Sequence, residues 1–379
     1  MSARIIVGDC VESMMRMPDK SVQCCVTSPP YWGLRDYGQD GQHGLEATPG
    51  AYVANLVRVF GEVRRVLRDD GTVWLNLGDS YASTTKGSGG HSAKQDSNPG
   101  SFAASALLFD LPAGIKAKDL VGIPWRVALA LQADGWYLRS DIIWHKPSPM
   151  PESVLDRPTK GHEYVFLLSK RPRYFYDLEA VREDPKPSNA GRMSAPKCGP
   201  ERVLGTANQT QKIYAEIKGA NRRTVWTIPS KPYTGAHFAT MPPELARLCI
   251  LAGTSQGGAC SACGAPWARV LERTPMEVRP SPRRMDWQTD QTRTQTGGTM
   301  TKAPTSETVG WAAGCECGAD VAPCVVLDPY AGAGTTGLVA AKLRRDFIGC
   351  ELNPEYAALT ERRLVGDSPL FADVAVDQP

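Results

Sequence analysis

Short apolar runs alternate with amphipathic stretches along most of this chain. Val22–Thr27 is mostly apolar and is stopped by Pro29, which predicts a buried strand because proline cannot donate to a sheet ladder. Tyr52–Leu67 repeats its apolar residues at three- and four-residue steps, which predicts a helix ended by a turn at Arg68–Gly71. The same patterns predict strands at Ile5–Asp9, Thr72–Asp79, Trp136–Lys146, His162–Lys170 and Val325–Leu327, and helices at Pro124–Ala133 and Met241–Gly253. The alternation predicts one α/β domain with insertions.

Two long segments interrupt this pattern. Arg171–Lys231 is rich in Pro, Gly and Asn and holds twelve Lys/Arg against six Asp/Glu, although the whole chain has 43 against 40. Such a local basic excess suits a polyanion-binding surface, and a solvated loop with spare lysines is the alternative. Pro275–Glu307 is rich in Thr, Pro and Arg and has no clear core pattern.

Bulk composition excludes some classes of protein. The 379 residues are 42% hydrophobic and 22% charged, which argues against wholesale disorder. No apolar run approaches the ~20 residues that span a membrane, and the start of the chain has no signal-peptide pattern. We therefore expect a cytoplasmic protein without membrane association. Its eleven cysteines should then be reduced, so that clustered ones indicate metal binding.

Two cysteine pairs have the spacing of metal knuckles. Cys260-x-x-Cys263 and Cys315-x-Cys317 each precede a glycine and flank the patternless segment. The prediction is a structural Zn²⁺ held by four thiolates, which would pin both ends of a long loop. The alternative is four free surface thiols, and Cys324 is a possible substitute ligand.

The C-terminal part contains a predicted strand–turn–helix–strand unit. The turn in DPYAGAGTTG, residues 328–337, lets a ligand approach the backbone at a helix N-terminus. Glu351 ends the next predicted strand, where a carboxylate grips ribose hydroxyls in nucleoside-binding α/β folds. The unit predicts a nucleoside cofactor, and its spacing does not exclude a dinucleotide.

The two ends of the chain together resemble a known family. TSPPYW (27–32) and DPYAGAGTT (328–336) are similar to the two signature motifs of the S-adenosylmethionine-dependent DNA amino-methyltransferases. Their order resembles that of the permuted beta class, in which the catalytic motif precedes the cofactor motif. Other blocks similar to the family are GDCVESMMRMPDKSVQCCV, VRRVLRDDGTVWLNLGDSY, DIIWHKPSPMPESV, GHEYVFLLSK and HFATMPPELARLCI. The resemblance therefore covers most of the chain.

For the fold, the resemblance implies a Rossmann-like α/β methyltransferase domain, circularly permuted, with a target-recognition insertion and a small zinc-knuckle insertion. The implied parts are 1–170, the catalytic half; 171–231, the target-recognition region; 232–256, a cofactor-pocket helix; 257–320, the insertion with zinc knuckles; 321–365, the cofactor-binding βαβ half; and 366–379, a C-terminal tail.

The resemblance also implies which residues bind S-adenosyl-L-methionine. Asp9 would hydrogen-bond the adenine, Glu351 the ribose, and Phe238–Pro242 would close the pocket from the other side. The implied cofactor-binding residues are Asp9, Phe238, Thr240, Pro242, Asp328, Pro329, Gly332, Gly334, Thr335, Thr336, Glu351 and Asn353. Tyr330 and Ala333 stand where relatives often have Phe and Ser.

The implied catalytic residues are Ser28, Pro29, Pro30 and Tyr31. Ser28 and the Pro29 carbonyl would hold the target amino group, with Tyr31 stacked on a base flipped out of double-stranded DNA. Trp32 is expected to pack. Asp79 either shapes the base pocket or caps the following turn.

The implied reaction is methyl transfer to an exocyclic base amine. Ser before Pro-Pro is more typical of cytosine-N4 enzymes, and adenine-N6 enzymes usually carry Asp or Asn there, so cytosine N4 is favoured. The alternatives are adenine N6, methylation of RNA or protein glutamine, and a non-catalytic zinc-bearing nucleic-acid-binding protein. A cognate restriction endonuclease is a possible partner, and the sequence leaves monomer and homodimer open.

Overall fold

The computed structural model describes residues 2–82, 114–183, 220–230, 241–275, 277–280, 298–302, 305–367 and 373–378. Phe238 and Thr240, both expected to bind the cofactor, lie outside the described residues. The chain forms two compact units. The larger comprises Met1–Asp177, Arg223–Trp267 and Ala313–Pro379, and the smaller comprises Leu178–Arg222 and Ala268–Ala312.

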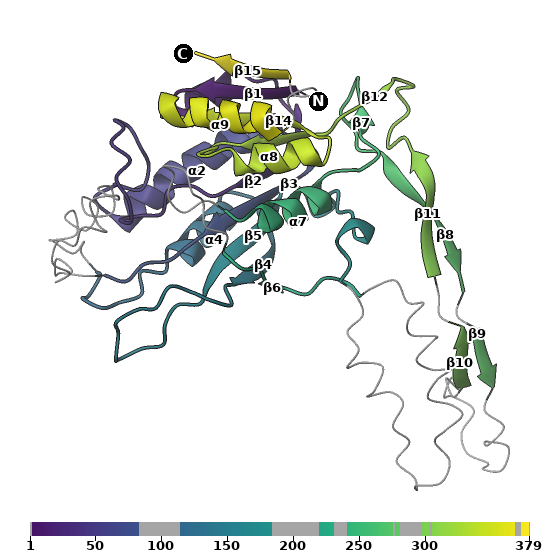
Figure 1. Ribbon diagram of the computed structural model, residues 1–379, viewed down its shortest axis with the longest axis horizontal. Coiled ribbons are helices and arrows are strands. Elements are labelled where there is room, and N and C mark those ends of the chain that lie inside the picture. Colours follow the sequence, from purple (N-terminus) through teal and green to yellow (C-terminus); the bar gives the residue numbers. More distant parts are fainter. Residues whose placement is uncertain are drawn as a thin grey trace, which may run out of the picture. The chain divides into compact units, whose positions relative to one another are not determined.

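The larger unit is built on one mixed sheet, which has nine strands within the described ranges, in the order β15-β1-β14-β13-β2-β3-β5-β4-β6 (Figure 1). The strands are β1 (Ser2–Val7), β2 (Val22–Thr27), β3 (Leu67–Leu77), β4 (Tyr137–His145), β5 (His162–Ser169), β6 (Val225–Thr227), β13 (Val325–Asp328), β14 (Asp346–Glu351) and β15 (Asp373–Asp377). β13 and β14, late in the chain, lie between the early strands β1 and β2, and these four pair in parallel. The predicted cofactor unit is thereby inserted beside the predicted catalytic strand.

Two groups of helices pack on this sheet. The first group is α1 (Cys10–Met15), α2 (Pro49–Val66) and α4 (Ile123–Ala133), and the second is α7 (Pro243–Gly253), α8 (Thr335–Lys342) and α9 (Pro354–Asp367). α2 begins where the Thr48 hydroxyl accepts the Ala51 amide and Pro49 occupies the first turn. Its apolar face, which includes Tyr52, Leu56 and Phe60, is fully buried. Burial of this face is what fixes α2 against the sheet.

The parallel strands end at one edge of the sheet. β1, β2, β3, β13 and β14 all run in the same direction, so their carboxyl ends meet there. β5 is antiparallel to β3 and therefore begins at this edge. Polar groups from strands far apart in sequence converge at this edge, which is where α/β proteins bind ligands.

The structure differs from the predicted elements in several places. Arg68–Gly71 is not the predicted turn, because β3 begins at Leu67, directly after α2. The pairing of β2 with β3 shifts register between Val22, which pairs with Leu67, and Cys24, which pairs with Thr72, so Arg68–Gly71 form a bulge in β3. α1 and β6 are too short to give a periodic signal. The predicted C-terminal tail contains β15, which adds to the edge of the sheet beside β1.

The smaller unit joins residues from both insertions. β8 (Ala268–Thr274) pairs with β11 (Thr305–Ala312), and β9 (Glu277–Pro280) pairs with β10 (Gly298–Lys302). The short helix η1 (Glu179–Val181) belongs to the same unit. The pairing was not visible in the sequence, because the strands are separated by residues without alternating apolar positions. In the described part of the chain, every helix is too short or too polar to cross a membrane.

Candidate active site

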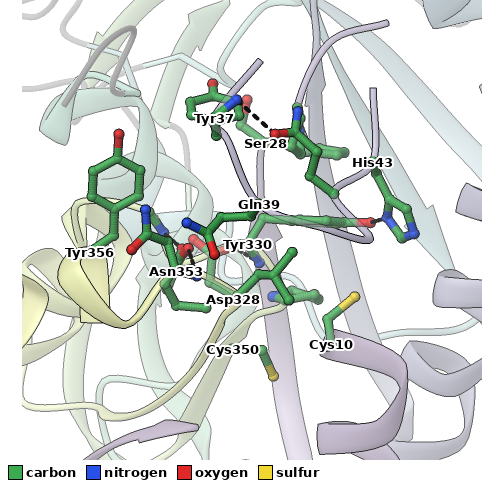
Figure 2. A pocket seen from close by; sticks show the side chains of 18 of the residues that line it. Cys10, Ser28, Tyr37, Gln39, His43, Asp328, Tyr330, Cys350, Asn353 and Tyr356 are labelled. Carbon is green, nitrogen blue, oxygen red and sulfur yellow. Dashed lines mark hydrogen bonds between the residues drawn. The ribbon is translucent and has the colours of Figure 1, made fainter. Parts of the chain in front are cut away.

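A cavity of about 160 Å³ lies at the carboxyl edge of the larger unit's sheet (Figure 2). It is lined by the predicted catalytic loop and the segment that follows it, by the predicted cofactor turn, and by residues at the ends of β1 and β14 and at Met241. Of the predicted site residues, the lining includes Asp9, Ser28, Pro29, Pro30, Tyr31, Asp328, Pro329, Gly332, Thr335, Thr336, Glu351 and Asn353. Gly334 and Pro242 do not line the cavity, although Met241, beside Pro242, does. The fold thus brings the two sequence motifs together in one pocket.

The predicted catalytic loop is held from behind by buried side chains. The Tyr52 hydroxyl donates to the Pro30 carbonyl at 2.8 Å, and Tyr52 itself lies in the core. Trp32 is 3% exposed and its indole N–H donates to the Glu46 carbonyl, so the expectation that it packs is confirmed. Together with the fixed φ of the two prolines, these contacts leave the loop little freedom.

Tyr31 is bound at both its ring and its hydroxyl. The ring lies against Gly78, where an added Cβ would come within 2.4 Å of Cε2. The hydroxyl donates to Glu163 Oε2 at 2.6 Å, and the Ser28 hydroxyl donates to the same phenol oxygen at 3.4 Å. Burial raises the pKa of Tyr31 well above its usual value, and the nearby Glu163 carboxylate raises it further.

Glu163 is the second residue of β5, at the same edge, and was not predicted from the sequence. Its Oε2 also accepts from Asn76 Nδ2 at 3.1 Å, and its Oε1 forms an ion pair with Lys146. Only the antiparallel pairing of β5 with β3 and β4 places these groups together. The residues next to Glu163 in the sequence do not distinguish it from a solvated glutamate.

The predicted cofactor turn is organised around Asp328. Its carboxylate accepts from the Thr27 hydroxyl at 2.6 Å, the Thr336 hydroxyl at 2.7 Å and the Tyr330 amide at 3.1 Å. Burial raises the pKa of Asp328 to about 7, against the lowering effect of these bonds. Gly334 adopts a φ of +71° with its backbone against Thr360, a position that a side chain would obstruct.

Two further carboxylates face the cavity. Glu351 accepts from the Gly332 amide at 2.7 Å and the Asn353 amide at 2.9 Å, and burial raises its pKa. Asp9 accepts from the backbone amides of Val11 and Glu12 and so caps α1. Both positions suit hydrogen bonding to the polar groups of a nucleoside, because each carboxylate keeps further lone pairs.

The segment Leu34–His43 follows the predicted catalytic loop and was not predicted from the sequence to line the site. It supplies much of one cavity wall, and its base is closed by a hydrogen bond from the Gly33 amide to the Gly44 carbonyl at 2.8 Å. His43 Nδ1 lies 2.6 Å from the Tyr330 hydroxyl, and Figure 2 shows the His43 ring beside Tyr330. The cluster of glycines in this segment was the available signal, because glycine is typical of tight loops that contact ligands.

Two further polar residues have structural partners. Asp79 accepts from the backbone amides of Gly122 and Ile123 at the start of α4, which is not the turn directly after Asp79 that the sequence suggested it caps. His145 is exposed on β4 and its Nδ1 lies 3.1 Å from the Thr227 hydroxyl of β6.

The four predicted metal ligands lie together. The sulfur atoms of Cys260, Cys263, Cys315 and Cys317 are all within 4.8 Å of one another. Backbone N–H groups of Cys263 and Ala262 lower the pKa of Cys260 to about 6, whereas neighbouring thiols raise the pKa of Cys317 to about 12. Four thiolates this close repel one another unless a cation lies among them, and an all-sulfur set of four matches a structural zinc site.

Comparison with known proteins gives the family. The N6/N4 DNA methylase profile, described as DNA methylase, matches residues 22–260 and 324–362. The chain belongs to this family. It is 40% identical over 365 residues to the type II methyltransferase M.Cfr9I of Citrobacter freundii, covering 96% of this chain and 88% of that protein.

Two solved structures share the fold. A putative DNA modification methylase from Thermus thermophilus, complexed with S-adenosyl-L-methionine, covers 99% of this chain and 98% of its own, with a TM-score of 0.51 and 20% identity. The PvuII DNA methyltransferase, described as cytosine-N4-specific, covers 96% of this chain and 87% of its own, with a TM-score of 0.51 and 16% identity. The chain therefore has the α/β fold of the S-adenosylmethionine-dependent methyltransferases.

Proposed function

We propose that this chain is a type II DNA methyltransferase that transfers a methyl group from S-adenosyl-L-methionine to the N4 amine of a cytosine flipped out of duplex DNA. One observation carries the proposal: Ser28–Tyr31 and the turn Asp328–Thr336 line a single cavity. Support also comes from family membership and from the 40% identical relative, which is a type II methyltransferase. The late strands β13 and β14 lie between the early strands β1 and β2, and this placement supports the permuted order.

The chain's own residues would activate the amine. An exocyclic base amine is a poor nucleophile because its lone pair is conjugated with the ring. Acceptors at the Ser28 hydroxyl and the Pro29 carbonyl would draw on its N–H groups and free that lone pair. Since the loop is already fixed by prolines and by Tyr52, the acceptors need no reorganisation as charge develops.

The residues present fit S-adenosyl-L-methionine. Glu351 would bind the ribose hydroxyls, Asp9 would bind the adenine, and the turn with Gly332 and Thr335 would hold the methionine part. Asp328 would act from behind, because its carboxylate oxygens already hold Thr27, Thr336 and the turn backbone. When bound, the cofactor supplies an electrophilic methyl group on a sulfonium.

The choice of cytosine rests on Ser28. A hydroxyl at this position is more typical of the family's cytosine-N4 enzymes, whereas adenine-N6 enzymes usually carry a carboxylate or an amide. We also propose that the four-cysteine cluster holds one structural Zn²⁺, and that the enzyme protects DNA against a restriction endonuclease of the same sequence specificity.

The test is methyl transfer itself. The purified protein is incubated with methyl-labelled S-adenosyl-L-methionine and bacterial DNA that lacks methylation, and the DNA is digested to nucleosides. We expect N4-methylcytosine at one recurring sequence. N6-methyladenine would contradict the base assignment alone, and the absence of label in DNA would contradict the whole proposal.

A further inference from the structure

A serine hydroxyl is an ambiguous acceptor. It carries one donor and two lone pairs and rotates about its C–O bond, whereas a carboxylate only accepts. In the proposed reaction Ser28 must accept from the target amine. If its own hydrogen pointed at the amine, the two donors would oppose each other. Something must therefore set the direction of the Ser28 O–H bond.

A chain of hydrogen bonds provides that direction. The Ser28 hydroxyl donates to the phenol oxygen of Tyr31 at 3.4 Å, and the Tyr31 hydroxyl donates to Glu163 at 2.6 Å. A phenol bonded to a carboxylate uses its only hydrogen there, so its oxygen can only accept from Ser28. Burial beside Glu163 raises the pKa of Tyr31, so the phenol keeps this hydrogen at neutral pH.

The end of this series of hydrogen bonds that is farthest from Ser28 is anchored. Lys146 forms an ion pair with Glu163 Oε1, and its side chain is 23% exposed against 13% for Glu163. Asn76 Nδ2 donates to the same carboxylate oxygen as Tyr31. Contact with Gly78 fixes the Tyr31 ring. Tyr31 and Glu163 are thus held in position before any substrate binds.

We propose that Tyr31 and Glu163 are positioning residues that turn the Ser28 hydroxyl away from the target amine, so that its lone pairs face that amine. The inference rests on the proposed function and extends it. It assigns to the Tyr31 hydroxyl a role separate from any contact between its ring and the base. It also explains how a hydroxyl performs the task for which adenine-type relatives use a carboxylate or amide.

The decisive experiment compares Tyr31→Phe in two backgrounds, the wild type and the Ser28→Asp variant. Phenylalanine keeps the ring against Gly78 and removes only the hydroxyl. In the wild-type background we expect kcat to fall about tenfold, with KM for DNA and cofactor changed less than about twofold, the size of one lost hydrogen bond. In the Ser28→Asp background we expect Tyr31→Phe to change kcat by less than about twofold, because a carboxylate needs no orientation.

A matched control and a second cycle complete the test. Tyr164→Phe removes a hydroxyl from the next position of β5, where the ring packs beside Phe166 and Trp125, and it should leave kcat unchanged. If the Ser28→Asp variants transfer no measurable methyl, the cycle of Tyr31→Phe with Glu163→Gln replaces them. If Glu163 acts only through Tyr31, the double variant Tyr31→Phe, Glu163→Gln is as slow as Tyr31→Phe alone.

Three results would overturn the inference. Tyr31→Phe could lower kcat equally in both backgrounds, or it could leave kcat unchanged in the wild-type background. In the second cycle, the fold-losses in kcat from Tyr31→Phe and Glu163→Gln could multiply in the double variant. A wild-type protein that methylates no DNA would instead overturn the proposed function.

Discussion

At the scale of single residues, Asp328 shows how the site combines structure with chemistry. Its carboxylate is 3% exposed and connects β2, through Thr27, with the first turn of α8, through Thr336. Burial outweighs the hydrogen bonds and raises its pKa to about 7. The native state therefore holds this proton at pH values where an unfolded chain, with a carboxyl pKa near about 3.9, has lost it.

The pKa shift of Asp328 predicts a pH-dependent stability. Because the folded pKa is raised, the native state binds more protons than the unfolded state, and stability decreases as pH rises from about 4 to about 7. Asp328→Asn cannot titrate. We expect the free energy of unfolding of the wild type to fall by up to about 4 kcal/mol more than that of Asp328→Asn over this range. Denaturant titrations at several pH values measure the difference, and parallel curves would contradict the prediction.

At the scale of elements, the loop Leu34–His43 depends on its contact with the cofactor turn. His43 is 8% exposed, and its ring meets the edge of the Tyr330 ring as well as the Tyr330 hydroxyl. This bond joins the loop after β2 to the turn after β13. A phenylalanine at position 330 would pack in the same place without the bond.

Removing that hydroxyl should weaken cofactor binding. Tyr330→Phe keeps the ring and loses the 2.6 Å contact with His43, so the loop Leu34–His43 loses one of the bonds that hold it at the cavity. We expect Kd for S-adenosyl-L-methionine, measured calorimetrically, to rise about three- to tenfold, the worth of one hydrogen bond. His43→Ala should weaken binding at least as much, and combining the two should add little. Unchanged affinity in Tyr330→Phe would show that the loop is held by other contacts.

At the scale of the whole molecule, the cysteine cluster lies where the chain leaves the larger unit for Ala268–Ala312 and returns. Gly314 packs so closely on the Pro266 carbonyl that an added Cβ would lie 2.3 Å from it. Arg68 donates to the Cys263 carbonyl and Gln23 to the Gly264 carbonyl, which ties the first knuckle to β2 and β3. The smaller unit holds fifteen Lys/Arg against ten Asp/Glu in sequence, and the rest of the chain holds 28 against 30.

Loss of the proposed metal should destabilise the chain. We expect one zinc per chain by elemental analysis, and none in a Cys263→Ser, Cys317→Ser double variant. That variant should melt about 5–10 °C below the wild type, because the sulfur cluster no longer closes the insertion. Ser261→Ala, an exposed change between two ligands, is the matched control and should keep both zinc and Tm. A double variant that keeps its zinc or its Tm would contradict a structural site.

The bounds of several helices and strands were predictable, because they depend on residues close together in the sequence. β2 matches its predicted bounds, and α4 and α7 each differ by one or two residues at their first position. The beginning of β3 was not predictable, because its polar residues Arg68–Asp70 suit a turn and lie in the bulge between Leu67 and Thr72, the residues that pair with β2. The hairpins of the smaller unit gave no apolar alternation, so the sequence predicted no structure there.

The sequence by itself determined the two motifs, the cysteine spacing and the alternation of strands and helices. Each of these depends on residues close together in the chain, where side-chain chemistry and periodicity act directly. Only the tertiary structure decided that Tyr31 meets Glu163, 132 residues away, and that His43 meets Tyr330, 287 residues away. Such contacts depend on strand order and on which strand ends share an edge. No local pattern encodes these contacts, because the sequence around a glutamate that is partnered inside the fold does not differ from the sequence around a solvated one.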